Sequence, residues 1–158
     1  MQKRPIWDAA GGGRAEKPVI SSRLAYTAGH LIREAGNFMN VETYNAFCKS
    51  LPHTSHVVQW GGAHVWKVAG KVFAIGSWND ADEALFVTFK CSPMSYDMLK
   101  EMPGCRPAPY LASRGMKWIQ RTGPETMDDE ALRDYLEESY RLVALGLPKN
   151  VQKELGIA

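Results

Sequence analysis

The sequence has few cysteines, and their arrangement excludes two common classes of small protein. Three cysteines occur among 158 residues, at widely separated positions and with no Cys-x-x-Cys pair. Disulfide-stabilised secreted domains usually carry a dense, even-numbered set, and zinc ribbons carry paired cysteines. Cys48, Cys91 and Cys105 therefore predict neither a disulfide framework nor a structural zinc site, and they fit a reducing cytoplasm.

Long apolar runs are also lacking. No segment approaches the roughly 20 apolar residues that a membrane-spanning helix needs, and the first residues lack the apolar stretch of a secretory signal. We therefore expect a cytoplasmic protein with no membrane partner. The chain also lacks a Gly-x-Gly-x-x-Gly motif and a phosphate-binding P-loop, so the sequence predicts no nucleotide cofactor.

The chain has no strong excess of charge of one sign. Its formal net charge is +2, from 19 lysines and arginines against 17 aspartates and glutamates. Residues 1–38 hold six basic and three acidic residues, which leaves thirteen against fourteen, a net charge of −1, for residues 39–158. Because a near-neutral domain cannot hold phosphates by its overall charge, nucleic-acid binding would need a local basic patch.

The N-terminal segment differs in composition from the rest of the chain. Residues 1–38 contain Gly11-Gly12-Gly13 and two prolines, and such a segment buries too little apolar area to offset the entropy lost on ordering. We predict a largely disordered extension over residues 1–38 and one domain over residues 39–158. Apolar residues between Leu24 and Ala35 recur at helical spacing and allow a short helix. Met39 stands where the domain begins and is an alternative start of the chain.

Helix signals occur at four places in residues 39–158. Asn40 is a good N-cap for a helix that ends before Pro52, and Ser92 followed by proline begins a second helix. The acidic run that starts at Asp128 begins the longest helix, because negative charge complements the helix dipole. That helix ends at Gly146, and a short one over residues 149–155 follows.

Strand signals lie between these helices. Residues 63–68, 71–76, 84–90 and 116–121 have strand character, and residues 56–60 are extended before the Gly61-Gly62 turn. Arg106 to Ala112 contains two prolines, which cannot donate to a β-ladder, so this stretch is an edge strand or an ordered loop.

Ala69-Gly70 predicts a two-residue hairpin turn between the first two strand runs. This turn pairs Val68 with Lys71, and strict alternation then sorts the side chains onto two faces. The face expected to meet the helices carries His64, Trp66, Val68, Phe73 and Ile75. The opposite face carries Val65, Lys67, Val72 and Ala74 and is expected to be solvated or to touch a partner.

Four motifs in this order resemble the MmcQ/YjbR family. They are the Trp60-Gly61-Gly62 turn, the hairpin Lys67-Val68-x-x-Lys71-x-Phe73-Ala74, Phe89-Lys90 before a helix that starts with proline, and Arg106-Pro107-Ala108-Pro109-Tyr110 followed by Trp118. The resemblance implies an α+β, two-layer α-β3-α-β2-α fold, in which helices cover one face of an antiparallel sheet, as in secretion chaperones. It also implies a DNA-binding protein with a double-wing motif, an inference from fold alone.

Seven basic residues are the candidates for contacts with nucleic acid. They lie on or near the predicted strands: Lys67, Lys71, Lys90, Arg106, Arg114, Lys117 and Arg121. The alternative is a solvated charged rim. Trp60 and Trp78 flank loops and are candidate surface aromatics, with packing at the strand ends as the alternative. Trp66 and Trp118 alternate inward and are expected in the core.

The remaining chemical residues predict no catalytic or metal site. His53, His56 and His64 are close in sequence, but a third zinc ligand is not evident. Cys105 is the thiol with a neighbouring cation, Arg106, and an inert small residue is the simpler interpretation. An enzyme would need a pocket that joins Trp60, His64 and Arg106.

Two functional hypotheses therefore come from the sequence. The first is a small cytosolic binding protein that contacts DNA through its basic strands. The alternative is a protein-interaction or dimerisation module, with no nucleic-acid role, which uses the open sheet face around Val65, Lys67, Val72 and Ala74.

Overall fold

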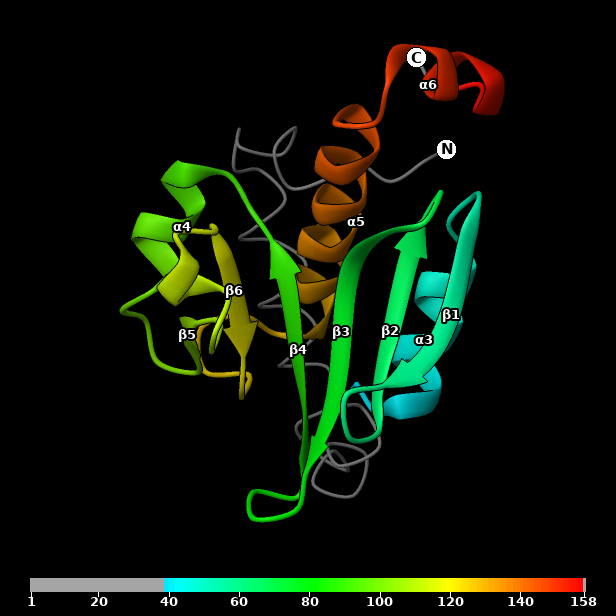
Figure 1. Cartoon of the computed structure of the whole chain (residues 1–158). Coiled ribbons are helices and arrows are strands. Elements are labelled where there is room, and N and C mark those ends of the chain that lie inside the picture. The colour runs from blue at the N-terminus through cyan, green and yellow to red at the C-terminus, as the bar shows by residue number, and fades with distance from the viewer. Residues whose placement is uncertain (1–38, 158) are drawn as a thin grey trace.

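The computed structural model describes residues 39–157 of the chain (Figure 1). The predictions of a disordered extension and of a short helix near its end concern residues 1–38, which lie outside the described residues. Residue 158 also lies outside the described residues.

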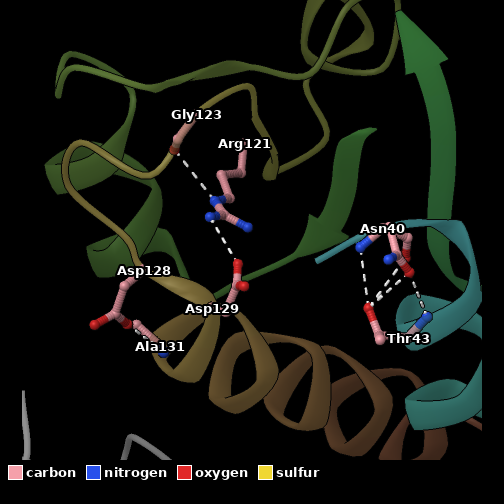
Figure 2. A network of polar contacts seen from close by, with 7 residues as sticks. All are labelled: Asn40, Thr43, Arg121, Gly123, Asp128, Asp129 and Ala131. Atoms are coloured by element: carbon pink, nitrogen blue, oxygen red, sulfur yellow. Dashed lines mark hydrogen bonds and ion pairs between the residues drawn. The ribbon is translucent and has the colours of Figure 1, made fainter. Parts of the chain in front are cut away.

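The helices begin where the sequence places their caps. Helix α3 spans Val41–Lys49, and Asn40 and Thr43 form a capping box in which Asn40 Oδ1 accepts a hydrogen bond from the Thr43 amide at 2.8 Å (Figure 2). Helix α4 spans Pro93–Leu99, with Ser92 as its cap. Helix α5 spans Asp129–Leu145, where Asp128 accepts from the Ala131 amide at 2.9 Å, and α6 spans Lys149–Leu155. All four predicted helices are confirmed.

The strands form one antiparallel sheet of six, not five. They are β1 Thr54–Gln59, β2 Ala63–Val68, β3 Lys71–Asn79, β4 Ala84–Lys90, β5 Cys105–Pro107 and β6 Trp118–Arg121, in the order β1-β2-β3-β4-β6-β5. The α+β class is therefore confirmed, but the predicted order α-β3-α-β2-α is wrong by one strand. The extended run before the Gly61-Gly62 turn pairs fully with β2 and becomes the edge strand β1.

A β-bulge in the β2–β3 hairpin corrects the predicted faces. Val68 pairs with Lys71 and Lys67 with Val72, as predicted, but Trp66 then pairs with Ala74 rather than Phe73. The extra residue keeps both Phe73 and Ala74 in the helix-covered core and turns Ile75 to the opposite face. Ile75 and Ala74 therefore exchange the faces that strict alternation assigns to them.

Helices α3 and α5 cover one face of the sheet, and in Figure 1 they lie behind the strands. Helix α5 packs on the middle of the sheet, where Phe89 stacks on Tyr135 and the Ser139 hydroxyl donates to the Phe73 carbonyl at 2.7 Å. Helix α3 packs on β3 at Gly76, directly above which lies the fully buried ring of Tyr44. No helix among residues 39–157 is long and apolar enough to cross a membrane.

Candidate nucleic-acid interface

The sheet face opposite α3 and α5 is the surface that the basic-strand hypothesis requires. Cross-strand partners share a face, so the row Val57, Val65, Ile75, Thr88, Gln120 and Arg106 crosses the whole sheet on one side. The adjacent row Trp66, Ala74, Phe89 and Ile119 belongs to the helix-covered core. Among residues 39–157, α3 and α5 pack on the other side, and we call the first side the helix-free face; in Figure 1 it is turned toward the viewer.

Three of the seven predicted basic residues lie on this helix-free face. By strand alternation Lys67 of β2, Lys90 of β4 and Arg106 of β5 all belong to it. Arg106 is exposed, and Lys67 and Lys90 are half-buried. The six described strands together contain five lysines and arginines and no aspartate or glutamate. No acidic strand residue therefore opposes the three cations.

Arg106 is held in place by its neighbours. Its Nε donates to Gln120 Oε1 at 2.7 Å, and Gln120 Nε2 in turn donates to the Thr88 hydroxyl at 3.3 Å. The Arg106 guanidinium also lies 5.7 Å from the centre of the Phe86 ring. Sequence reasoning missed these three supporting residues, although the period-two alternation of Phe86, Thr88 and Lys90 was a usable signal.

Three other predicted cations are exposed but lie elsewhere. Lys71 is exposed at the start of β3, beside the hairpin turn. Arg114 donates to the Tyr110 hydroxyl at 2.8 Å, and the Lys117 ammonium lies 4.9 Å from the centre of the Tyr96 ring. These contacts orient the two side chains in the segment that leads into β6, with Lys117 beside α4.

Arg121 is not available as a phosphate contact. Its side chain is only 6% exposed and points to the helix-covered side, where Nη2 donates to Asp129 Oδ1 at 3.0 Å and Nε to the Gly123 carbonyl at 3.2 Å (Figure 2). A buried cation needs such a partner because the interior does not solvate its charge. We therefore exclude Arg121 from the interface.

The tryptophans fall into the two predicted groups. Trp60 is 64% exposed at the β1–β2 turn, and Trp78 is 51% exposed at the end of β3. Trp66 and Trp118 are buried, as predicted. Trp66 belongs to the helix-covered core and donates from Nε1 to Asn45 Oδ1 at 2.8 Å. Trp118 shares the parity of Gln120 and so lies on the helix-free face.

Two of the three histidines interact with each other. His56 Nε2 and His64 Nδ1 are 3.0 Å apart, and the His56 ring lies 4.8 Å from that of Trp66. Partial burial and the neighbouring His64 lower the pKa of His56. His53 lies in the preceding turn with a positive φ. Within residues 39–157, no group of three or more potential ligands is placed to hold a metal ion.

The cysteine and enzyme hypotheses find no support in the geometry. Burial raises the pKa of Cys105 more than nearby Arg121 lowers it, so the thiol is not activated. His64 shares the helix-covered side of β2 with Trp66, whereas Arg106 lies on the opposite face at the other end of the sheet. A single pocket cannot join these two side chains.

The fold and its surface define a two-layer α+β domain with an open six-stranded sheet. The chain belongs to the YjbR family, whose sequence model matches residues 49–142, and this confirms the MmcQ/YjbR resemblance. No curated protein matches the chain.

Two solved structures are similar in fold. One is the crystal structure of a Deinococcus radiodurans protein with the domain DUF419: it is 24% identical, with a TM-score of 0.65, and the match covers 77% of this chain and 91% of that chain. The other, from Pseudomonas syringae, is 17% identical with a TM-score of 0.54 over 66% and 98% of the two chains. At these identities the structural matches show the fold alone.

Proposed function

We propose that this YjbR-family domain binds DNA through the helix-free face of its sheet. The observation that supports the proposal is the separation of charge between the two layers. Three of the five strand cations lie on the helix-free face and no strand carries an acidic residue, whereas α5, on the other face, carries five acidic residues and two arginines. A near-neutral domain thereby presents a local basic surface, which is what attraction of a polyanion requires.

The three cations of the helix-free face are spaced across the sheet. Neighbouring strands lie about 4.8 Å apart, so Lys67 on β2, Lys90 on β4 and Arg106 on β5 stand on alternate strands at steps of about 10 Å. This spacing is comparable with the major groove of DNA, about 12 Å wide. The three side chains can therefore contact phosphates on both sides of one groove.

Arg106 is the best-oriented contact of the three. Gln120 holds its Nε, so the guanidinium plane is fixed before DNA arrives and less side-chain entropy is lost on binding. The two terminal nitrogens of the exposed group can then donate together to one phosphate. We expect Arg106 to contribute more to affinity than either lysine.

Binding to a short fluorescent duplex, followed by anisotropy at several salt concentrations, tests the proposal. Three phosphate contacts predict a slope of log K against log[salt] of about −2.7, or an affinity loss of roughly 40-fold between about 50 and 200 mM salt. Replacing Lys67, Lys90 and Arg106 together by alanine should remove most of the affinity and flatten the slope. A Gln120→Leu variant, which frees Arg106 from its support, should weaken binding less.

A matched variant separates this site from general charge. Replacing Lys49, Lys149 and Lys153 by alanine also removes three positive charges, but from exposed positions on α3 and α6. This control should bind DNA nearly as well as the unmodified protein. Equal losses in both triple variants, or no binding by the unmodified protein at low salt, would refute the proposal.

A second candidate function is self-association or protein binding through the same face. Val57, Val72 and Ile75 are half-buried apolar side chains on the helix-free face, near the exposed Trp60 of the edge-strand region. Val65 of the same row is fully buried and is not available for contact. An unpaired edge next to apolar side chains is a common site for addition of a strand. Sedimentation equilibrium tests this: a Val72→Asp variant should shift a dimer to monomer, and a strictly monomeric unmodified protein would exclude self-association.

A further inference from the structure

A pocket lies at the opposite end of the sheet from the β2–β3 turn, apart from the proposed DNA surface. It has a volume of about 270 Å³. Its lining includes Trp78 near the end of β3, the cross-strand partner Leu85, Met39 and Asn40 before α3, and the segment from Arg121 to Pro124. Pockets for drug-sized molecules typically measure about 300–1,000 Å³. This one therefore suits a molecule of one or two rings.

The walls of the pocket are mainly apolar, and one of them is a half-exposed aromatic ring. Trp78 is 51% exposed, whereas Leu85 and Met39 are buried at 7% each. An exposed indole beside a cavity is costly to leave in water and offers a flat surface on which another ring can stack. The geometry of the walls therefore favours a planar, apolar ligand.

Arg121 supplies the polar end of the pocket. Its guanidinium is anchored at two nitrogens, to Gly123 and Asp129, and in Figure 2 the third nitrogen points to the side of the view on which Asn40 lies. Asn40 and Arg121 both line the cavity. A guanidinium donates hydrogen bonds and accepts none, so the group it suits is an acceptor oxygen.

The balance of charge selects a neutral acceptor over a carboxylate. Asp129 already offsets the charge of Arg121 at 3.0 Å, and Glu83 adds a carboxylate to the pocket lining. Glu83 is exposed, so solvent screens its charge, but a carboxylate ligand would still bring a charge into the pocket where Asp129 already neutralises Arg121. Burying such an unpaired charge is costly. A carbonyl oxygen accepts from Arg121 without that cost.

We propose that this pocket binds a small, planar, uncharged aromatic molecule that bears a carbonyl oxygen. The ring stacks on Trp78 between Leu85 and Met39, and the carbonyl accepts a hydrogen bond from Arg121. Amides of aromatic acids and the oxygen-bearing nucleobases belong to this chemical class. The inference is independent of DNA binding, because the pocket is on the helix-covered side of the sheet.

NMR titration with three probes of the same ring tests the proposal: 2-naphthamide is neutral, 2-naphthoate is an anion and 2-naphthylmethylammonium is a cation. The indole N–H signal of Trp78, assigned from the Trp78→Phe spectrum, should shift on addition of the amide. We expect the amide to bind at least threefold more tightly than either charged probe. Tighter binding of the carboxylate, or no shift with any probe, would overturn the assignment.

Variants of the two exposed tryptophans give a matched comparison. Trp78→Ala should weaken binding of the amide about tenfold, because stacking on an aromatic side chain is lost, while Trp78→Phe keeps part of the affinity. Trp60→Ala, an equal change at an exposed site outside the pocket, should have no effect. Equal effects at both positions would contradict the site. None of these variants should alter DNA binding, so the two proposals can fail separately.

Discussion

Gly76 is the position where a single methyl group should be most damaging. A Cβ added there would lie 2.6 Å from Cε2 and 2.8 Å from Cζ of Tyr44, well inside contact distance. The Tyr44 ring is fully buried, and its hydroxyl donates to the His64 carbonyl at 2.9 Å. Gly76→Ala must therefore move either α3 or a ring that cannot turn away without losing this hydrogen bond.

The expected cost combines three effects. Forcing an extra methyl group into a packed core costs about 1–3 kcal/mol. Weakening the bond from Tyr44 to the His64 carbonyl adds about 1 kcal/mol. Alanine is a better strand residue than glycine by roughly 0.5–1 kcal/mol, which offsets part of the loss. We therefore expect Gly76→Ala to lower the free energy of unfolding by about 2 kcal/mol.

Urea and thermal unfolding followed by circular dichroism measure this cost, and a loss of about 2 kcal/mol corresponds to a fall in Tm of roughly 5–10 °C. Gly146→Ala is the matched control, because its Cβ would meet its nearest atom at 3.4 Å, and it should change stability little. In a Tyr44→Leu background, which removes the clashing ring atoms, the cost of Gly76→Ala should shrink. A loss below about 0.5 kcal/mol, or additive effects in the double variant, would refute the packing argument.

Three further predictions concern other parts of the domain. Ala69 has a φ of +50° in the hairpin turn, a conformation that asparagine adopts more readily than alanine. Ala69→Asn should therefore raise the free energy of unfolding by about 0.5–1 kcal/mol, measured by urea unfolding. A lower free energy of unfolding in this variant would count against the turn assignment. The pKa of His56 is lowered in the folded state, so the unfolded state binds more protons as pH falls through about 6.5. The free energy of unfolding should therefore decline in this pH range. When Tm is measured against pH, the decline should be less steep in His56→Gln. Burial raises the pKa of Cys91 to about 12 and the pKa values of Cys48 and Cys105 above their usual value. All three thiols should therefore react with Ellman's reagent only after unfolding in urea. Rapid reaction of the native protein would contradict their burial.

Local chemistry accounts for the parts of the fold that could be predicted. The caps at Asn40, Ser92 and Asp128 act on amides within three residues, so each helix start is encoded where it occurs. The Ala69-Gly70 turn likewise sets the first two cross-strand pairs by its length alone. The predicted strands over residues 63–68 and 84–90 match β2 and β4.

Features that depend on packing could not be predicted in the same way. The bulge at Phe73 breaks the period of two because α5 needs Phe73 and α3 needs room at Gly76 on the same side of one strand. The burial of Arg121 depends on Asp129, which meets it only when the connection after β6 brings the start of α5 back beside the end of that strand. In the sequence, the positive charge of Arg121 did not distinguish this residue from the other basic candidates.

For this chain the sequence by itself determined the family, the helix starts and the hairpin turn, and it made Trp60 and Trp78 the candidate surface aromatics. Only the tertiary structure decided that Lys67, Lys90 and Arg106 share a face, that Arg121 is buried beside Asp129, and that Trp78 borders a pocket. The physical reason is that caps and turns depend on backbone groups within a few residues. The other arrangements depend on how strands and helices pack against one another, which holds even for Arg121 and Asp129, eight residues apart, because the connection from β6 to α5 must first turn back.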